Sequence, residues 1–389
     1  MTRFRSGQDL NIEIATQNPA RQRTGAAAWR NVLVLQTSFI GDTVLTLPLI
    51  AEVRRRFSVR NLSLVCQPAS AELLQGHPAI DEIIVDDKRH ADAGLSGMYR
   101  KAQALAERKF TLALTPHKSL RSALLLYLAR IPVRIGFAQS RGWFLFHRRI
   151  ARDPTRHDVE RNLSLLNAFG VAVEDCQRAL ELPVNPQLQS EVDKKLADLG
   201  IDAEKPIIGV NPGSVWPTKR WPAEAFADLI VRLEESLDCR IVLFGGADDA
   251  AVVNRVLGAC GGAASSLAGK VTLRELPAAI RRCRVFVTND SGPMHIAVAE
   301  RVPTVAIFCA TTRELGFFPY TNHAVVVEKR LFCRPCTSHG GRRCPLGTEA
   351  CSRLIDPARV FAAVEKLLRS VPGDVWAPPD RFEPEFVAA

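Results

Sequence analysis

The sequence predicts an α/β protein built from two doubly wound domains that face each other across a cleft. Short, continuously apolar segments alternate with amphipathic segments of helical periodicity, the pattern of parallel sheets covered on both faces. This alternation runs through one series, is interrupted by the proline-punctuated stretch Leu182–Pro186, and then runs through a second series. The chain of 389 residues is long enough for two or three domains of roughly 150 residues each.

The first series is expected to form a domain of residues 30–185. Residues 1–29 are polar and dotted with arginine, and we expect a disordered leader there. The first strand is followed by a helical stretch that ends at Phe57. The expected strands are Val32–Gln36, Leu62–Cys66, Ile83–Asp86, Thr111–Thr115 and Val133–Phe137, and two further helices are expected at Ser96–Lys109 and Ser119–Arg130.

The second series is expected to form a domain of residues 186–370. Its strands are expected at Pro206–Asn211, Arg240–Gly245, Arg284–Asn289 and Pro303–Phe308. Its helices are expected at Ala223–Leu237, Asp248–Ala259, Leu273–Cys283 and Pro293–Glu300. Residues 371–389 are rich in proline and are expected to form an irregular tail.

Charge and composition narrow the choice of partner. Lys and Arg number 51 against 41 Asp and Glu, a formal net charge of +10, which favours an anionic partner. Only three tyrosines and five tryptophans are present, so the aromatic side chains that stack nucleic-acid bases are scarce and nucleic acid is not expected. No apolar run approaches the roughly 20 residues that span a bilayer, and no secretory signal begins the chain, so a cytoplasmic address is expected.

The segment Gln36–Thr43 directly follows the first strand. Gly41 permits a tight turn into the next helix, which places Asp42 at the helix entrance. Asp42 is either a helix cap or a carboxylate placed at the mouth of the cleft as a general base. The segment lacks the glycine spacing of a dinucleotide fingerprint and of a P-loop.

Two segments of the second domain have the composition of anion sites. Asn211–Pro222 follows a strand and carries Ser214, Thr218 and Lys219, which predicts a phosphate cradle or, in the simpler interpretation, a solvated basic loop. Thr288–His295 also follows a strand. Its Ser291 or Gly292 is expected to cap a helix whose N-terminus faces the cleft, and His295 is expected one turn into that helix. Asp290 either accepts a hydrogen bond from a sugar hydroxyl or only caps the helix.

Two further groups have a chemical interpretation. Lys118 and Arg121 follow the strand Thr111–Thr115 and are expected to hold an anionic acceptor. Four cysteines gather near the end of the chain, with spacing C-x2-C-x7-C-x6-C. They predict a structural zinc site, two disulfides or a cluster of free thiols. The four are Cys333, Cys336, Cys344 and Cys351.

Three of these segments, in this order and spacing, resemble glycosyltransferase family 9, the ADP-heptose:lipopolysaccharide heptosyltransferases of Gram-negative bacteria. The segments are Val32–Pro48, Asn211–Pro222 and Thr288–Ala297, and the similarity spans residues 30–370. The cysteine segment, with Cys-Pro-Leu-Gly at 344–347, is similar to the heptosyltransferase II branch.

The resemblance implies a GT-B fold, meaning two Rossmann-like domains with the active site between them. It implies an inverting transfer of a heptose from ADP-heptose to the lipid A–Kdo inner core, without a divalent metal or other required cofactor, by an enzyme held peripherally at the cytoplasmic face of the inner membrane. Asp42 is then the base and Lys219 binds the donor phosphate. Asp290, Ser291, Gly292 and His295 hold the diphosphate and heptose, and Asp248 contacts the ribose or adenine.

Two alternatives from other classes remain at this point. A nucleotide-sugar epimerase or hydrolase of GT-B type would share the fold and the phosphate cradle but use no acceptor. A catalytically silent sugar-nucleotide-binding protein would keep Lys219 and His295 and would need no Asp42. A nicotinamide dehydrogenase is disfavoured because the glycine fingerprint is missing.

Overall fold

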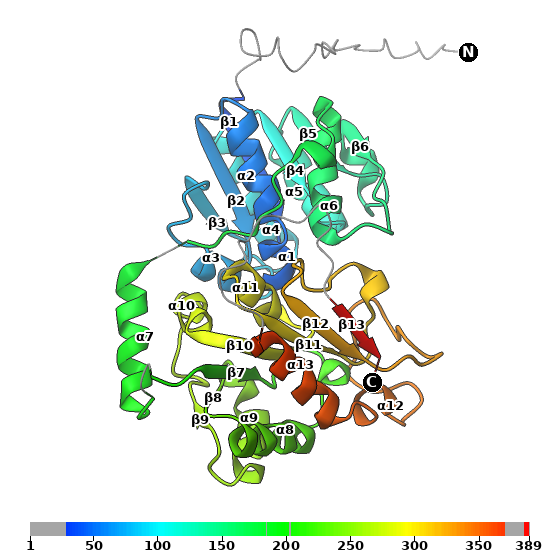
Figure 1. Cartoon of the computed structure of the whole chain (residues 1–389). Coiled ribbons are helices and arrows are strands. Elements are labelled where there is room, and N and C mark those ends of the chain that lie inside the picture. The colour runs from blue at the N-terminus through cyan, green and yellow to red at the C-terminus, as the bar shows by residue number, and fades with distance from the viewer. Residues whose placement is uncertain (1–28, 184, 202–203, 370–384, 389) are drawn as a thin grey trace, which may run out of the picture.

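The computed structural model describes residues 29–388 apart from residues 184, 202–203 and 370–384. Two parallel sheets, each covered by helices, lie one above the other with a cleft between them (Figure 1). The α/β class and the two doubly wound sheets predicted from the sequence are confirmed. The expected leader lies outside the described residues, except for Trp29.

The N-terminal sheet has the strand order β3-β2-β1-β4-β5-β6, and all its pairs are parallel. Its strands are β1 (Asn31–Gln36), β2 (Asn61–Cys66), β3 (Glu82–Val85), β4 (Leu112–Thr115), β5 (Val133–Phe137) and β6 (Arg148–Ile150). Its helices are α1 (Ile40–Val44), α2 (Leu47–Arg56), α3 (Pro68–Leu73), α4 (Gly94–Glu107), α5 (Leu120–Leu128) and α6 (Asp158–Leu163).

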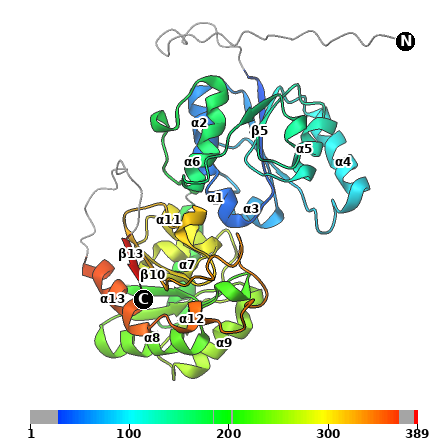
Figure 2. The same cartoon turned by 90° about the vertical axis from the view of Figure 1, so that its right-hand side faces the viewer.

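The buried strand β1 shows why this domain folds as it does. Val32 and Val34 pack in one apolar cluster, with residues of α2 and α6. Leu33 and Leu35 pack in another, with residues of α4 and α5. Successive side chains of a strand point to opposite faces, so a continuous apolar run needs helices on both sides of the sheet (Figure 2).

The second sheet has the order β13-β12-β11-β10-β7-β8-β9 and is also wholly parallel. Its strands are β7 (Ile207–Asn211), β8 (Arg240–Leu243), β9 (Ser265–Ser266), β10 (Cys283–Asn289), β11 (Thr304–Phe308), β12 (Ala324–Glu328) and β13 (Glu385–Ala388). Its helices are α7 (Pro186–Asp198), α8 (Ala223–Ser236), α9 (Ala250–Ala259), α10 (Leu276–Arg281), α11 (Gly292–Ala299), α12 (Ala350–Arg353) and α13 (Pro357–Arg369).

The structure corrects three expectations. The first helical stretch is two helices, because Thr46 Oγ1 donates to the Asp42 carbonyl at 2.7 Å and Pro48 begins a new helical turn. The helix expected to end at Cys283 stops at Arg281, and Cys283 opens β10. The tail is not irregular throughout, since β13 adds a parallel strand beside β12.

Each sheet has a switch point where chain order reverses, between β1 and β4 and between β7 and β10. Ligands of open α/β sheets bind outside the carboxyl ends of strands at these points. The loops that leave β1, β7 and β10 there are the three segments singled out from the sequence. The fold therefore brings all three to the cleft.

Two short helices hold the domains together at the cleft floor, α1 of the first and α11 of the second. A Cβ on Gly41 would lie 2.8 Å from His295 Cδ2, and a Cβ on Gly292 would lie 2.6 Å from Ile40 Cγ2. Both distances are below ordinary van der Waals contact. Only glycine at these two positions permits the helices to approach this closely.

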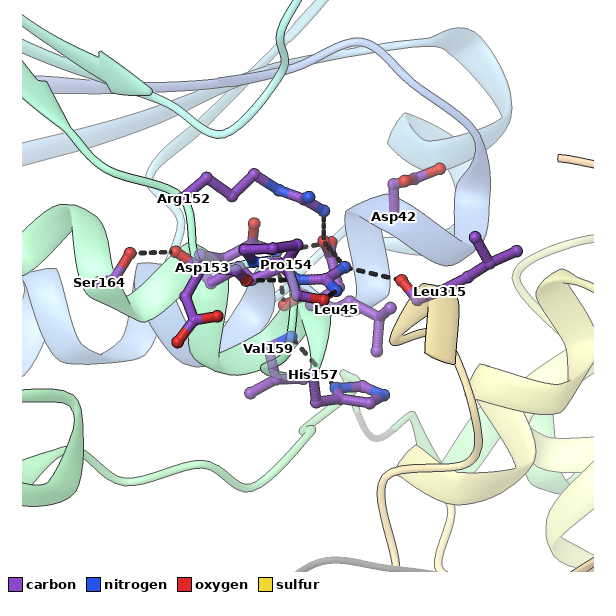
Figure 3. A network of polar contacts seen from close by, with 12 residues as sticks. Asp42, Leu45, Arg152, Asp153, Pro154, His157, Val159, Ser164 and Leu315 are labelled. Atoms are coloured by element: carbon purple, nitrogen blue, oxygen red, sulfur yellow. Dashed lines mark hydrogen bonds and ion pairs between the residues drawn. The ribbon is translucent and has the colours of Figure 1, made fainter. Parts of the chain in front are cut away.

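A second interdomain contact joins residues 152–161 to the loop before Tyr320. The buried guanidinium of Arg161 donates to the carbonyls of Pro154 at 2.6 Å and Leu315 at 2.7 Å, and Asp158 N donates to Gly316 O at 2.8 Å. Figure 3 shows this network, with Asp42 on the neighbouring helix. Leu315 also lines the cleft, so the contact lies at the wall of the cavity.

In the part of the chain that the structure describes, no helix combines the length and apolarity needed to cross a bilayer.

Replacing Gly292 with alanine should destabilise the protein by about 1–3 kcal/mol, because the new methyl group overpacks the α1–α11 contact. The matched control is Gly258→Ala on the exposed side of α9, where a Cβ meets no atom within 4 Å. This control should be stabilised by about 0.5–1 kcal/mol. Urea unfolding measures both, and equal effects at the two glycines would contradict the close approach.

Candidate active site

The cleft encloses a cavity of about 740 Å³ lined by both domains. The first domain contributes the loop after β1 with Asp42, and the second contributes the loops after β7 and β10. The sequence-predicted residues that line it are Asp42, Ser214, Lys219, Asp248, Asp290, Ser291, Gly292 and His295. Of the predicted donor residues, Thr218 alone is absent from the lining.

Asp42 is half-buried at the third position of α1, not at the N-cap. Its carboxylate accepts a hydrogen bond from Phe39 N at 3.2 Å, so it does satisfy a free amide at the helix start. Burial, with the nearby Asp158 carboxylate adding, raises the pKa of Asp42 to about 6. Such a carboxylate is ionised at neutral pH and is a stronger base than a solvated one.

Lys219 forms an ion pair with Asp290, with 2.6 Å between Nζ and the Oδ2 atom. Thr311 donates to the same carboxylate oxygen at 2.6 Å. Asp290 is almost fully buried, and Lys219 is slightly more exposed toward the cavity. The ammonium group is therefore held in a fixed place, while two of its three protons remain for another acceptor.

The N-terminus of α11 faces the cavity, since Ser291, Gly292 and Pro293 all line it. Asn211 lies within 3.4 Å of Ser291 Oγ and within 3.2 Å of Thr288 Oγ1, which ties the loops after β7 and β10 together. Burial, with Lys219 adding, lowers the pKa of His295 to about 4. This neutral ring has a buried Nδ1 without a hydrogen-bond partner in the described residues.

The remaining donor-side residues differ in how they are placed. Ser214 is buried, and Arg220 donates to its carbonyl at 2.8 Å. Asp248 is exposed at the cavity edge. Thr218 is turned instead toward Gly341, with which it exchanges two hydrogen bonds of 2.7 and 3.2 Å.

The two predicted acceptor residues do not line the cavity. Arg121 is engaged by its own domain, because it donates to the buried Asp86 carboxylate at 2.7 Å. Lys118 as a whole residue is exposed, but its amine is partly buried. This partial burial and the charge of Arg152 lower the pKa of Lys118, while Asp158 and Asp42 act in the opposite direction. Lys118 is therefore within electrostatic range of Asp42, whereas Arg121 is occupied by its ion pair with Asp86.

Sequence reasoning missed several residues of the site. Lys88 donates to Thr37 O at 2.6 Å beside the Asp42 loop, and Arg89 lines the cavity. His339, from the cysteine segment, also lines the cavity and lies within electrostatic range of Asp42. These residues stand in turns without a motif, so only their proximity in the fold identifies them.

The cysteine segment contributes a wall of the cleft. Its loop between Cys336 and Cys344 carries Ser338 and His339 into the cavity lining and is tied to Thr218 by the hydrogen bonds of Gly341. Because Thr218 precedes Lys219, this loop is fastened to the same short segment that holds the cleft lysine.

The four cysteines lie within electrostatic range of one another. Burial raises the pKa of Cys351 to about 11, and the other three thiols add to this effect. The half-buried Cys344 differs, because backbone N–H groups, that of Glu349 first, lower its pKa. All four are free thiols, and no group of three or more His, Cys, Asp or Glu within the described ranges is arranged to hold a metal ion. No disulfide joins these four cysteines in the described structure, and the zinc site stays a prediction.

Comparisons with known proteins agree with this geometry. The family model for glycosyltransferase family 9 (heptosyltransferase) matches residues 98–345. Lipopolysaccharide heptosyltransferase 2 of Salmonella typhimurium is 30% identical over 304 residues, which cover 75% of this chain and 86% of that protein. This chain belongs to glycosyltransferase family 9. It is a glycosyltransferase, and the epimerase and silent-protein alternatives are not supported.

Solved structures confirm the GT-B fold of this family 9 member. A family 9 glycosyl transferase from Veillonella parvula is 26% identical, with a TM-score of 0.79 over 88% of this chain and 98% of that one. ADP-heptose lps heptosyltransferase II of E. coli is 25% identical, with a TM-score of 0.70 over 87% and 98% of the two chains.

Brief alkylation should modify Cys344 well before Cys351, since the first thiol is accessible with a lowered pKa and the second is buried. Mass spectrometry of protein purified without chelator measures the order. Uniform protection of the four thiols with about one zinc per chain would support the metal hypothesis. Less than about 0.2 zinc per chain, with four reactive thiols, would remove it.

Proposed function

We propose that this enzyme transfers a heptose from ADP-heptose to the lipid A–Kdo inner core of lipopolysaccharide, with inversion at the anomeric carbon. The named relatives support heptosyl transfer in lipopolysaccharide assembly. ADP-heptose is part of the name of the E. coli protein, whereas the lipid A–Kdo acceptor and the inversion are this proposal's own.

One observation supports the mechanism above the others. A carboxylate with a raised pKa and a fixed lysine beside a helix N-terminus line the same cavity from opposite domains. An inverting transfer needs a base on the acceptor side and a group that stabilises the leaving group on the donor side. The two halves of that requirement are divided between the two domains.

Asp42 acts as the general base in this proposal. It takes the proton of the acceptor hydroxyl as that oxygen bonds to the anomeric carbon of the heptose. The bond from this carbon to the diphosphate breaks at the same time, and ADP leaves with the electron pair. A positioned base contributes typically about 10²–10⁴-fold to the rate.

The donor side supplies charge and dipoles where the leaving group gains negative charge. Lys219 is fixed by Asp290, and the N-terminus of α11 adds the positive end of a helix dipole. The unpartnered Nδ1 of His295 is available for a hydrogen bond. We propose that these groups stabilise departing ADP without a divalent metal.

We propose that Lys118 contacts the acidic acceptor, since it is exposed and within electrostatic range of Asp42. A glycolipid acceptor also implies peripheral contact with the cytoplasmic face of the inner membrane. Closure of the two domains would bring the acceptor hydroxyl and the donor together.

Asp42→Asn should lower turnover by about two to four orders of magnitude, because the amide cannot accept the proton. The Asn oxygen can still accept from Phe39 N, so the fold and the thermal stabilisation by ADP should survive. Asp42→Ala should show the same loss of rate with about 1 kcal/mol lower stability. Transfer by Asp42→Asn within about threefold of the parent would show that Asp42 only caps the helix.

The value of kcat/KM should fall as pH drops through about 6, because the base must be ionised in the free enzyme. The same carboxyl has an opposite effect on stability. Its folded pKa lies above the model value of 3.8, so its contribution to stability is lost as pH rises between the two values. Asp42→Asn should remove this slope from urea unfolding measured across that window, and an unchanged slope would assign the pKa to another group.

Lys219→Ala should weaken use of ADP-heptose by about 1.5–3 kcal/mol through loss of a charge-assisted phosphate contact. The measurement is donor kinetics at saturating acceptor. The control is Lys205→Ala, which also breaks a lysine–aspartate pair, that with Asp238, outside the cavity lining. Equal donor kinetics in the two variants would take Lys219 out of the donor site.

A further inference from the structure

The positive charge of the chain is concentrated in one part of the N-terminal domain. Residues 108–152 contain ten lysines and arginines and no aspartate or glutamate, while the formal net charge of the whole chain is +10. This stretch forms β4, α5, β5 and β6, which occupy one side of the sheet. Arg108, Arg121 and Arg152 pair with carboxylates of other segments.

Four exposed arginines of this stretch have no such partner, and three of them lie close together in the chain. Arg141, Arg148 and Arg149 form no ion pair with a carboxylate of the described chain. They flank the short 3₁₀ helix η1 (Trp143–Leu145), and the Arg149 guanidinium lies 5.1 Å from the centre of the Trp143 ring. Unpaired cations thus surround an aromatic segment.

Exposed apolar side chains gather on the same face. Trp143 is 46% and Phe144 61% exposed, and their rings meet edge to face with centroids 6.0 Å apart. A Cβ on Gly142 would lie 2.4 Å from Ala123 Cβ, so η1 packs directly on α5. Leu120 of α5 is also exposed, as are Leu95 and Tyr99 of α4, the helix that packs along α5 (Figure 2).

This face borders the acceptor side of the cleft. Helices α4 and α5 begin after the carboxyl ends of β3 and β4, the same edge of the sheet at which β1 leads into Asp42. The exposed Leu95, Tyr99 and Leu120 all lie in the first two turns of these helices. A partner bound here would therefore lie next to the entrance through which an acceptor must pass.

We propose that this surface, formed by η1, the first two turns of α4 and α5, and Arg141, Arg148 and Arg149, docks on an anionic lipid bilayer. Trp and Phe are suited to the interfacial layer, and arginines beside them are attracted by acidic headgroups. Neither signal alone anchors a protein firmly, but together they do. This surface gives a location to the membrane contact of the proposed function. The identity of the glycolipid rests on the proposed function, but binding to the bilayer does not.

Sedimentation with vesicles tests the surface without any substrate. The full chain should bind phosphatidylcholine vesicles that contain one quarter phosphatidylglycerol and should bind pure phosphatidylcholine poorly. Binding should weaken as NaCl is raised to about 0.5 M, because salt screens the headgroup charge. Arg148→Glu with Arg149→Glu, and Trp143→Ser with Phe144→Ser, should each reduce binding to the anionic vesicles by roughly tenfold or more.

Matched controls come from the second domain. Phe332 is 95% exposed, and Arg342 and Arg343 are adjacent exposed arginines. Phe332→Ser and the double change Arg342→Glu with Arg343→Glu should retain vesicle binding. The substituted side chains are exposed in every variant, so thermal unfolding should stay near that of the parent.

Three outcomes would overturn the proposal. These are equal losses in the surface and control variants, equal binding to neutral and anionic vesicles, and self-association through this face without vesicle binding. Transfer to a water-soluble acceptor fragment separates this proposal from the proposed function. With this soluble acceptor the surface variants should transfer heptose at the same rate as the unmodified protein. If the unmodified protein transferred heptose to no acceptor, the proposed function would be rejected, but the result with vesicles would still hold.

Discussion

The close approach of α1 and α11 is the constraint on which the cleft depends. Gly41 and Gly292 remove the side chains that would hold the two helices apart, so that the loop carrying Asp42 and the helix carrying His295 share one cavity. Neither domain lines the cavity alone. Each forms one side of it, and the two glycines set the separation of the sides.

Charged groups in the cleft are positioned by neighbours that are themselves buried. Asp290, which itself accepts a hydrogen bond from Thr311, holds Lys219. Arg152 and Arg161 hold Asp158, whose charge in turn acts on Asp42. Such groups need little reorganisation when charge moves during a reaction, which is why fixed donors and acceptors in an enclosed site are effective. Loss of either member of such a buried ion pair leaves the other charge uncompensated and destabilises the folded protein.

The sequence was informative where local chemistry and topology agree. Apolar runs predicted the central strands, and polar segments placed directly after them had to meet at the carboxyl edges of the sheets, which is why Asp42, Lys219 and Asp290 were found. Long-range pairing left no comparable signal. No sequence pattern around Arg121 predicts its ion pair with Asp86, and none in the tail predicts the pairing of β13 with β12. His339 lines the cavity only because the cysteine segment folds back toward it.

The contact between residues 152–161 and the loop at Leu315 has a kinematic consequence. Two bodies that touch at two places retain one easy relative motion, a rotation about the line joining the contacts. Here the contacts are the α1–α11 pair and the Arg161–Leu315 bond, and Asp42 lies beside both (Figure 3). The hydrogen bond from Leu273 N to Glu72, at 3.0 Å, bridges the cavity walls elsewhere and would act as a latch on that rotation. The carboxylate near the axis would then stay almost still while the far rim of the cleft swings open.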